Sequence, residues 1–260
     1  MATGRPKTNR NVGQLVKLSI HEFRLPLRHV FTISRESVAV QSTLIVELAH
    51  DEFRGFGEAT SNAYYGMTID RMRDDLERLR PTIESHDHID PEQFWPQAAQ
   101  ELADDPFALC ALDQAAWDLW GKRRGAPLYQ LWNLSTDDVP LSNFTIGIDS
   151  IEKMVAKLRE MPGWPVYKIK LGTDRDLEIV AALRQETDAV FRVDANCGWK
   201  VEQAIEYSSA LAELGVEFIE QPLPADDQAG AERLFEASAL PLIADESCIT
   251  ETDVEACQGR

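Results

Sequence analysis

The feature that most constrains this chain is a set of short apolar runs between residues 166 and 246, each ending in charged residues. The charged ends fall at Lys170, Asp194, Glu220 and Asp245, so successive ends lie 24, 26 and 25 residues apart. A period near 25 residues is the length of one strand–helix–strand unit with short loops. The recurrence therefore predicts parallel strands joined by right-handed helical crossovers.

The segments between these runs have the spacing of helices. Apolar residues recur at helical intervals from Val201 to Leu214, and Gly215 stands where a helix would end. Similar patterns predict helices near residues 177–183 and 228–237. Because the apolar runs are nearly continuous, we expect the strands to be buried on both faces.

The charged strand ends indicate a reaction site. In a parallel barrel, the carboxyl ends of all strands open on one face, where the chemistry takes place. Lys168 and Lys170 would then meet three carboxylates, Asp194, Glu220 and Asp245. Carboxylates that converge repel one another unless a cation holds them, and hard oxygen ligands suit Mg²⁺, with Mn²⁺ as the alternative.

Composition excludes several classes of partner. The chain has 260 residues, of which 44% are apolar and 27% charged, and its net charge is −18. Such an acidic protein is a poor partner for nucleic acid or an anionic membrane. Residues 1–14 read as a polar, disordered tail, without the apolar core of a signal peptide or membrane span. We therefore expect a cytoplasmic protein whose partners are a small molecule and further copies of itself.

The four cysteines form no CxxC pair, and without an export signal we expect them to be reduced. Two of them, Cys197 and Cys248, lie near the predicted site. We interpret both as small residues that pack beneath loops, in preference to nucleophiles.

The N-terminal half predicts an α+β domain over residues 15–137. Strands at 15–25, 39–49 and 53–58 form an antiparallel meander, with a polar link from Arg28 to Ser37. Helices follow from Thr68 to about Leu79 before Pro81, from residue 91, from 107 to 123, and briefly at 127–129. The sequence Gly55-Phe56-Gly57 lacks a third glycine and carries no phosphate-loop signal.

A polar linker at 135–139 precedes the second predicted domain, residues 138–260. That domain begins with a strand at Pro140–Ile148 and a helix at 150–161, and the repeating region follows. The fold class is therefore α/β: an α+β capping domain, then a TIM-type (β/α) barrel of which this sequence contains about five strands.

This combination resembles the enolase superfamily in its muconate-lactonizing subgroup. Within that subgroup, short stretches of the sequence are most similar to the dipeptide epimerases that include L-Ala-D/L-Glu epimerase. The resemblance extends over almost the whole chain from about Val16. The stretches that carry it are Phe31–Arg35, Ala111–Asp118, Phe144–Asp149, Tyr167–Gly172, Val193–Trp199, Ile219–Leu223 and Ala244–Ser247.

The resemblance implies a Mg²⁺-dependent epimerase that removes the α-proton of a dipeptide through an enediolate. It makes Asp194, Glu220 and Asp245 the metal ligands and Lys170 a general base. Lys168 would contact the substrate carboxylate and make its neighbour less basic by like-charge repulsion. Arg35 would meet the distal group of the substrate, and Thr145 would be a further substrate contact.

Alternatives remain open at this stage. A closed barrel needs eight strands, so we expect the opposite-face lysine and the Asp-x-Asp that binds a dipeptide ammonium to lie beyond residue 260. The sequence then reads as a C-terminally incomplete epimerase that is inactive alone. Other proton-transfer enzymes of the superfamily are rivals, namely a cycloisomerase, an o-succinylbenzoate synthase or an N-acylamino acid racemase. A truncated, inactive protein is the last alternative.

Overall fold

The computed structural model describes residues 15–137 and 139–257, which form two compact units. The first unit contains residues 15–26, 40–137 and 139, and the second unit contains residues 27–39 and 140–257. The predicted tail at 1–14 lies outside the described residues. The predicted boundary at 137/138 stays a prediction, because residue 138 is also outside them.

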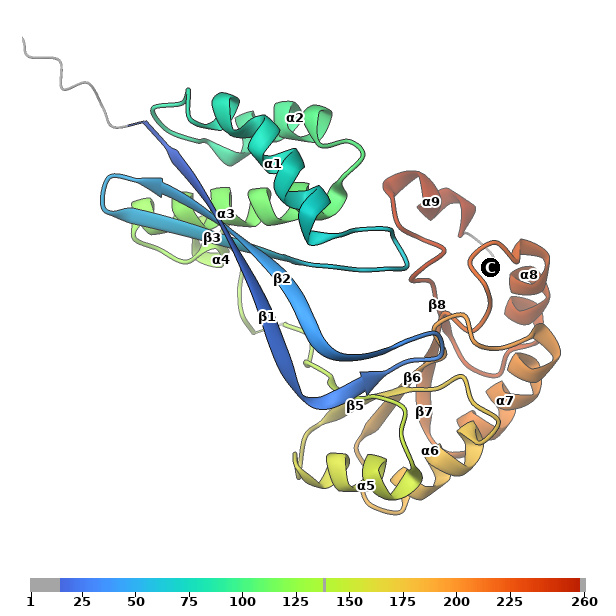
Figure 1. Ribbon diagram of the computed structural model, residues 1–260. Helices are drawn as coiled ribbons and strands as arrows, with labels where there is room; N and C mark the ends of the chain where they lie inside the picture. Colours follow the sequence, from blue (N-terminus) through green and yellow to red (C-terminus); the bar gives the residue numbers. More distant parts are fainter. Residues whose placement is uncertain (1–14, 138, 258–260) are drawn as a thin grey trace, which may run out of the picture. The chain divides into compact units, whose positions relative to one another are not determined.

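A three-stranded sheet with the order β1-β2-β3 opens the chain, as Figure 1 shows; its strands are β1 (Lys17–Thr32), β2 (Ser37–His50) and β3 (Phe53–Thr60). The meander is confirmed, with β2 and β3 antiparallel from Thr43 opposite Thr60 to His50 opposite Phe53. The first two strands run further than predicted. They do so because strands tolerate polar residues at exposed positions. The link between them contains only residues 33–36, and the Ile33 amide closes it by donating to the Glu36 carbonyl at 3.0 Å.

The helices of the first unit are α1 (Ile69–Ile83), α2 (Pro91–Glu101), α3 (Pro106–Arg124) and α4 (Leu128–Leu131). The prediction that α1 ends near Leu79 was wrong, since the helix continues through Pro81. Pro81 stands in the last turn of α1, where it removes one intrahelical donor. Leu79 and Ile83 are both buried, so packing favours the extra turn.

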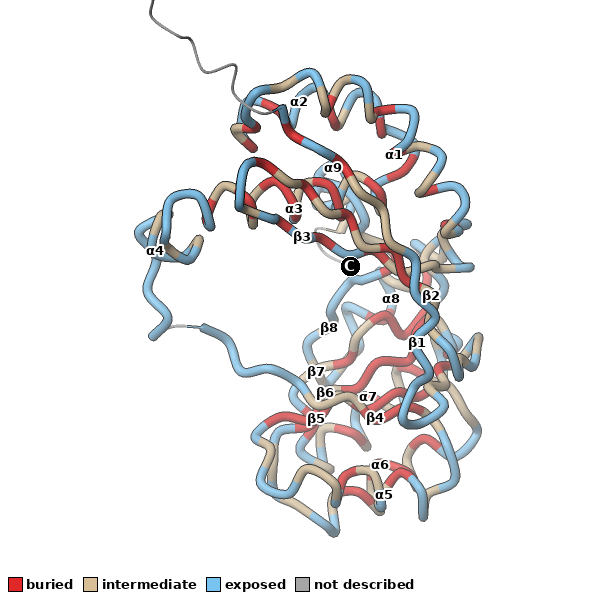
Figure 2. The backbone as a smooth tube through the Cα atoms, turned by 60° about the vertical axis from the view of Figure 1, so that its left-hand side comes forward, coloured by how far each residue is buried: buried red, intermediate tan, exposed pale blue. Residues whose placement is uncertain are grey.

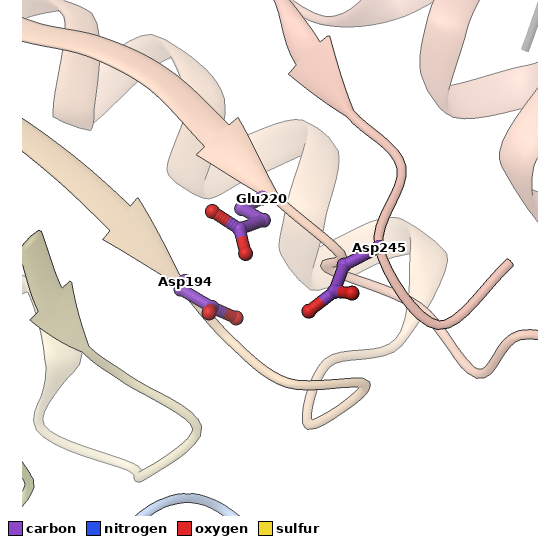
Figure 3. A group of neighbouring side chains, drawn as sticks. All are labelled: Asp194, Glu220 and Asp245. Atoms are coloured by element: carbon purple, nitrogen blue, oxygen red, sulfur yellow. The ribbon is translucent and has the colours of Figure 1, made fainter. Parts of the chain in front are cut away.

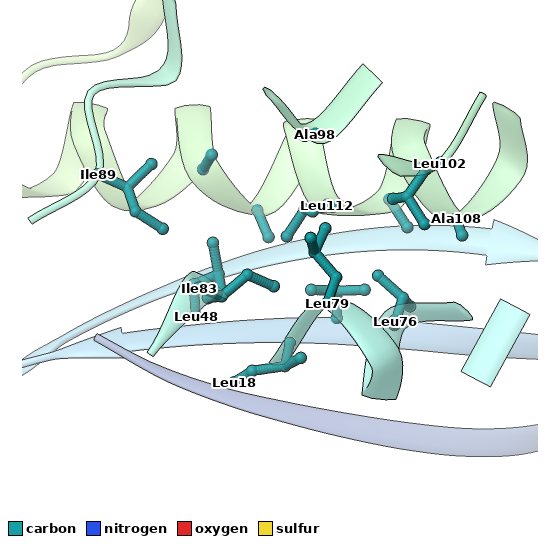
Figure 4. Close-up of a cluster of buried hydrophobic side chains, with 14 of the residues drawn as sticks. Leu18, Leu48, Leu76, Leu79, Ile83, Ile89, Ala98, Leu102, Ala108 and Leu112 are labelled. Atoms are coloured by element: carbon teal, nitrogen blue, oxygen red, sulfur yellow. The ribbon is translucent and has the colours of Figure 1, made fainter. Parts of the chain in front are cut away.

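The core of this unit lies between the sheet and helices α1–α3 (Figure 4). Contact between α3 and β3 depends on two glycines. A Cβ atom on Gly57 would lie 1.9 Å from the Ala111 carbonyl oxygen, and one on Gly55 would lie 2.2 Å from that of Ala115. The Gly-x-Gly sequence is therefore explained by close helix packing. Side chains of α3 also bond the β3 backbone, since the Phe56 amide donates to Asp118 Oδ2 at 2.8 Å.

The second unit contains a five-stranded parallel sheet with the order β4-β5-β6-β7-β8. Its strands are β4 (Phe144–Ile146), β5 (Val166–Lys170), β6 (Val190–Asp194), β7 (Val216–Glu220) and β8 (Leu242–Ile243). The intervening helices are α5 (Ile151–Arg159), α6 (Asp176–Arg184), α7 (Val201–Glu213) and α8 (Gln228–Ala237), and α9 (Glu251–Ala256) follows. Figure 1 shows α5–α8 along one side of the sheet, so the predicted repeating α/β architecture is confirmed.

Both outer strands are shorter than predicted. β4 covers three residues of the expected Pro140–Ile148, and beyond it the Ile148 amide donates to the Thr32 carbonyl at 2.8 Å. β8 ends at Ile243, two residues before Asp245. Proline explains part of this, because Pro140 and Pro241 have no N–H to donate to a ladder.

Burial is concentrated in the central strands. Figure 2 marks most of β5 and β6 as buried, and the largest fully buried side chains there are Tyr167 and Phe191. The expectation of burial on both faces was wrong in detail, since Glu217 on β7 and Ile243 on β8 are exposed. Among the described residues, no helix has the length and apolar character needed to cross a membrane.

Candidate active site

Three carboxylates meet at the carboxyl ends of neighbouring strands. The parallel register places Asp194 beside Glu220, and Asp245 follows β8 on the far side of β7. Figure 3 shows the three side chains pointing toward one another, and one oxygen from each lies within 4.8 Å of the others. A cation bonded at about 2.1 Å would hold such oxygens no more than about 4.2 Å apart. The donor set therefore fits a divalent metal after a small closure.

Two lysines reach the same carboxylates from β5. Lys170 donates to Asp194 Oδ2 at 2.6 Å. Lys168 Nζ lies 2.6 Å from Glu220 Oε1 and 3.0 Å from Asp194 Oδ2. Both lysines share one side of β5 because side chains two residues apart point to the same face. The predicted convergence of these five groups is confirmed, and together they leave one net negative charge.

The electrostatics follow from burial and these ion pairs. Burial alone would raise the pKa of Asp194, but Lys170 and Lys168 outweigh it and hold that pKa below its ordinary value. Burial lowers the pKa of Lys168, yet its bond to Glu220 and the charge of Asp194 raise it overall. Burial, with repulsion from Asp194, raises the pKa of Glu220. A bound cation would favour the ionised form of such a carboxylate.

Asp245 depends on the preceding strand for its position. Its pKa is raised by burial first, then by the charges of Glu246 and Asp194. Gln221 Oε1 accepts hydrogen bonds from the Asp245 amide at 2.9 Å, the Ser247 amide at 3.1 Å and the Ser247 hydroxyl at 2.9 Å. One buried side-chain oxygen therefore fixes the turn that carries the third carboxylate.

The segment around Arg35 borders this group within the second unit. The Arg35 guanidinium donates to the Asn196 carbonyl at 3.1 Å and to Glu246 Oε1 at 2.6 Å, and Glu246 is buried. Ser34 Oγ donates to the same carbonyl at 2.7 Å. Arg35 thus contacts Asn196, which follows Asp194 by two residues in the sequence. Its role toward a substrate stays a prediction.

Thr145 lies on β4 directly opposite Lys168 in the parallel register. Paired residues of neighbouring parallel strands point to the same face, so Thr145 shares the face of the two lysines. Its predicted role as a substrate contact stays a prediction.

Sequence reasoning assigned no role to Gln221, Asn196 or Glu246. All three are buried polar residues beside the carboxylates. Gln221 and Asn196 have positive φ angles of 34° and 44°. Buried polar groups at unusual backbone angles gather at functional sites. The sequence offered one signal for them, which is position. Gln221 and Glu246 each come directly after a predicted metal ligand, and Asn196 comes two residues after one.

The four cysteines all lie among the described residues, and none of them forms a disulfide there. The Cys197 amide donates to the Gln221 carbonyl at 2.8 Å and the Cys248 amide to the Asp245 carbonyl at 2.9 Å. Both cysteines therefore belong to the turns that carry the site.

A parallel α/β sheet with acid and lysine side chains at its carboxyl edge defines the class of barrel-type enzymes that act at strand ends. Two family descriptions match the chain. Residues 16–132 match the mandelate racemase/muconate lactonizing enzyme N-terminal domain, and residues 150–257 match the enolase C-terminal domain-like family. The chain therefore belongs to the mandelate racemase/muconate lactonizing enzyme family of the enolase superfamily.

Individual relatives agree with this. The chain is 54% identical over 242 residues to the L-Ala-D/L-amino acid epimerase of Flavobacterium johnsoniae, which covers 93% of the chain and 72% of that relative. A solved L-Ala-D/L-Glu epimerase from Bacillus subtilis superposes with a TM-score of 0.85 at 25% identity, over 94% of this chain and 71% of that one.

A dipeptide epimerase from Enterococcus faecalis, solved with Mg and L-Leu-L-Tyr, gives a TM-score of 0.81 at 28% identity, over 92% and 70% of the two chains. The chain thus spans about seven tenths of the length of the relatives it matches.

Proposed function

We propose that this site performs Mg²⁺-dependent epimerisation of dipeptides by removing the α-proton beside the substrate carboxylate. The observation that carries the proposal is the approach of Lys170 and Lys168 to a group of three carboxylates. Relatives at 54% and 50% identity are named L-Ala-D/L-amino acid epimerases, which supports a dipeptide substrate.

The metal would be held by Asp194, Glu220 and Asp245. Three hard oxygen donors from separate strand ends suit Mg²⁺, and the Enterococcus faecalis relative was solved with Mg. When bound, the ion supplies positive charge beside the substrate carboxylate, where negative charge grows as the proton leaves. The net negative charge of the lysine–carboxylate group favours a cation at this position.

The lysines divide the remaining work. Lys170 is buried at the end of β5, and its Nζ accepts the α-proton when it is neutral. Lys168 lies further back on the same face and orients the substrate carboxylate through its ammonium charge. Thr145, opposite Lys168 on β4, and Arg35, beside Asn196, contact other parts of the dipeptide.

Two wider assignments belong to the same proposal. Four cysteines that form no disulfide among the described residues fit a reducing compartment such as the cytoplasm. The second assignment is that the protein forms a homo-oligomer. Light scattering of the purified protein tests it, and a monomer at micromolar concentration would contradict it.

The function is tested by deuterium uptake at the α-carbon. The protein is incubated in D₂O with Mg²⁺ and either L-Ala-L-Glu or L-Ala-D-Glu, and the α-proton signal is followed by NMR. We expect Lys170→Ala to slow uptake from one epimer by about 10²–10⁴-fold, the usual contribution of a general base. Lys153→Ala, which removes an exposed lysine on α5, is the matched control. Equal uptake by parent and Lys170→Ala from both epimers would sink the assignment of the base.

A further inference from the structure

A further buried carboxylate contacts the loops after β5 and β6 and has no role in the proposed chemistry. Asp176, the first residue of α6, is fully buried. Its Oδ1 accepts hydrogen bonds from the Thr173 amide at 2.8 Å and the Thr173 hydroxyl at 2.7 Å. Its Oδ2 accepts from the Gly172 amide at 2.8 Å and from Trp199 Nε1 at 2.7 Å. All four donors are neutral, and hydrogen bonds to a charged acceptor are the strong kind.

The two oxygens do different things. The partners of Oδ1 belong to the loop that follows Lys170, so these bonds hold that loop to the start of α6. Oδ2 joins that loop, through Gly172, to the loop that follows Asp194, through Trp199. The Trp199 bond therefore crosses from the strand end that carries the lysines to the one that carries a carboxylate.

The backbone between these loops is tightly packed. The Leu171 amide donates to the Asp194 carbonyl at 2.9 Å. Gly172 has φ 115°, where other residues are strained, and a Cβ on Gly198 would lie 3.0 Å from the Gly172 Cα. Such close contact leaves little room for one loop to slide past the other.

We propose that Asp176 is a positioning residue, which acts through Gly172 and Trp199 to set the separation of Lys170 and Asp194. The inference rests on the proposed function, in which one residue is the base and the other a metal ligand. A displacement of about 1 Å at a reacting group can cost about 100-fold in rate. An acceptor that binds both loops at once limits that displacement. A purely local role at the start of α6 would not require the bond to Trp199, 23 residues away.

The test removes the bond between the loops and leaves the carboxylate. Trp199→Phe deletes the indole N–H. Trp164→Phe is its matched control in the same unit, because Trp164 Nε1 donates to the Ser142 carbonyl at 2.9 Å and not to a residue of the site. Amide hydrogen exchange is measured on the metal-free protein, and Mn²⁺ affinity by calorimetry. We expect Trp199→Phe to speed exchange at Leu171 about tenfold more than at strand centres. Mn²⁺ should bind about tenfold more weakly, which is the lower end of the loss seen when a direct partner of a metal ligand is removed, because Trp199 acts on Asp194 through the loop. Trp164→Phe should change neither.

Asp176→Asn is the second variant, because an amide offers one acceptor oxygen to donors that need two. It should reproduce both effects and shift the Trp199 indole proton signal. Asp105→Asn, which alters another buried aspartate in the first unit, should leave Mn²⁺ affinity unchanged.

Unchanged Leu171 exchange and unchanged Mn²⁺ affinity in either folded variant would overturn the proposal. Failure of both variants to fold would also overturn it, because the role would then be structural. If the parent bound no metal, the proposed function would fail, while exchange at Leu171 would still decide whether Asp176 positions the two loops.

Discussion

The contact between α3 and β3 and the carboxyl edge of the β4–β8 sheet show two opposite uses of buried space. At the first, Gly57 and Ala111 bring backbone against backbone beside the apolar core of the first unit. At the second, Asp194, Lys170 and Glu246 are buried with charges. Burying charge has a large desolvation cost that ion pairs offset only partly. The first region is arranged for stability, and the second keeps charged groups in place at a cost to stability.

The largest expected effect lies in the packed region. Gly57→Ala puts a methyl group 1.9 Å from the Ala111 carbonyl oxygen, so α3 must move off β3. We expect the free energy of unfolding to fall by about 3 kcal/mol, at the upper end for overpacking. Urea unfolding followed by tryptophan fluorescence measures it.

Gly121→Ala is the control for that change, within the same helix. Its added Cβ would meet the Ala126 carbonyl oxygen and Leu128 Cδ2 at 3.3 Å, and alanine is favoured over glycine in a helix by about 0.5–1 kcal/mol. The two effects nearly cancel, so stability should change by less than about 1 kcal/mol. Equal losses in the two variants would mean that close approach to β3 is not what Gly57 provides.

A substitution in the charged region should have effects of opposite sign on stability and binding. The pKa of Asp245 is raised, so at neutral pH its ionised carboxylate is less favourable in the folded chain than in the unfolded one. Asp245→Asn should therefore increase the stability of the metal-free protein. It should also weaken Mg²⁺ binding by at least about tenfold, since a charged ligand is lost. Calorimetry and thermal unfolding on the same sample check both signs.

Asp226→Asn is a suitable control for that variant, because Asp226 is an acidic residue of the same unit that does not belong to the carboxylate group. Lower stability together with unchanged affinity in Asp245→Asn would contradict the contrast between the two regions.

The smallest effect concerns a charge inside the packed region. Asp105 caps α3 by accepting from the Ala108 amide at 2.9 Å, and burial raises its pKa. A raised carboxyl pKa means that the folded state binds more protons, so its contribution to stability falls as pH rises above about 4. Asparagine is a comparable cap without this titration. Asp105→Asn should therefore gain stability relative to the parent between pH 4 and 7. A difference that does not change with pH would show that Asp105 does not titrate as described.

The repeating half was the more predictable one from sequence. The ends of β5, β6 and β7 fall at Lys170, Asp194 and Glu220 as predicted, because each apolar run stops at a charged residue. Strand register then places neighbouring ends side by side without further information. The carboxylate group followed from periodicity and one general property of parallel sheets.

The sequence did not predict the long-range hydrogen bonds that hold the loops of the site in place. The role of Gln221 depends on an amide side chain that bonds the turn after β8, and the role of Asp176 depends on a tryptophan 23 residues away. Neither contact has a period or a local motif. The two outer strands were predicted too long for a related reason, since the ladder partner that decides how much of an apolar run is a strand lies elsewhere in the chain.

The contacts of Gln221 limit how the site can be transferred. An engineer who grafts the three acidic side chains onto another barrel must also carry over an amide at the residue after the second ligand and a hydroxyl two residues beyond the third. Without them, the segment from Asp245 to Ser247 loses three hydrogen bonds to one oxygen. The smallest portable unit is therefore larger than its ligands, and scaffold searches that match only carboxylate positions will select loops unable to hold the last of them.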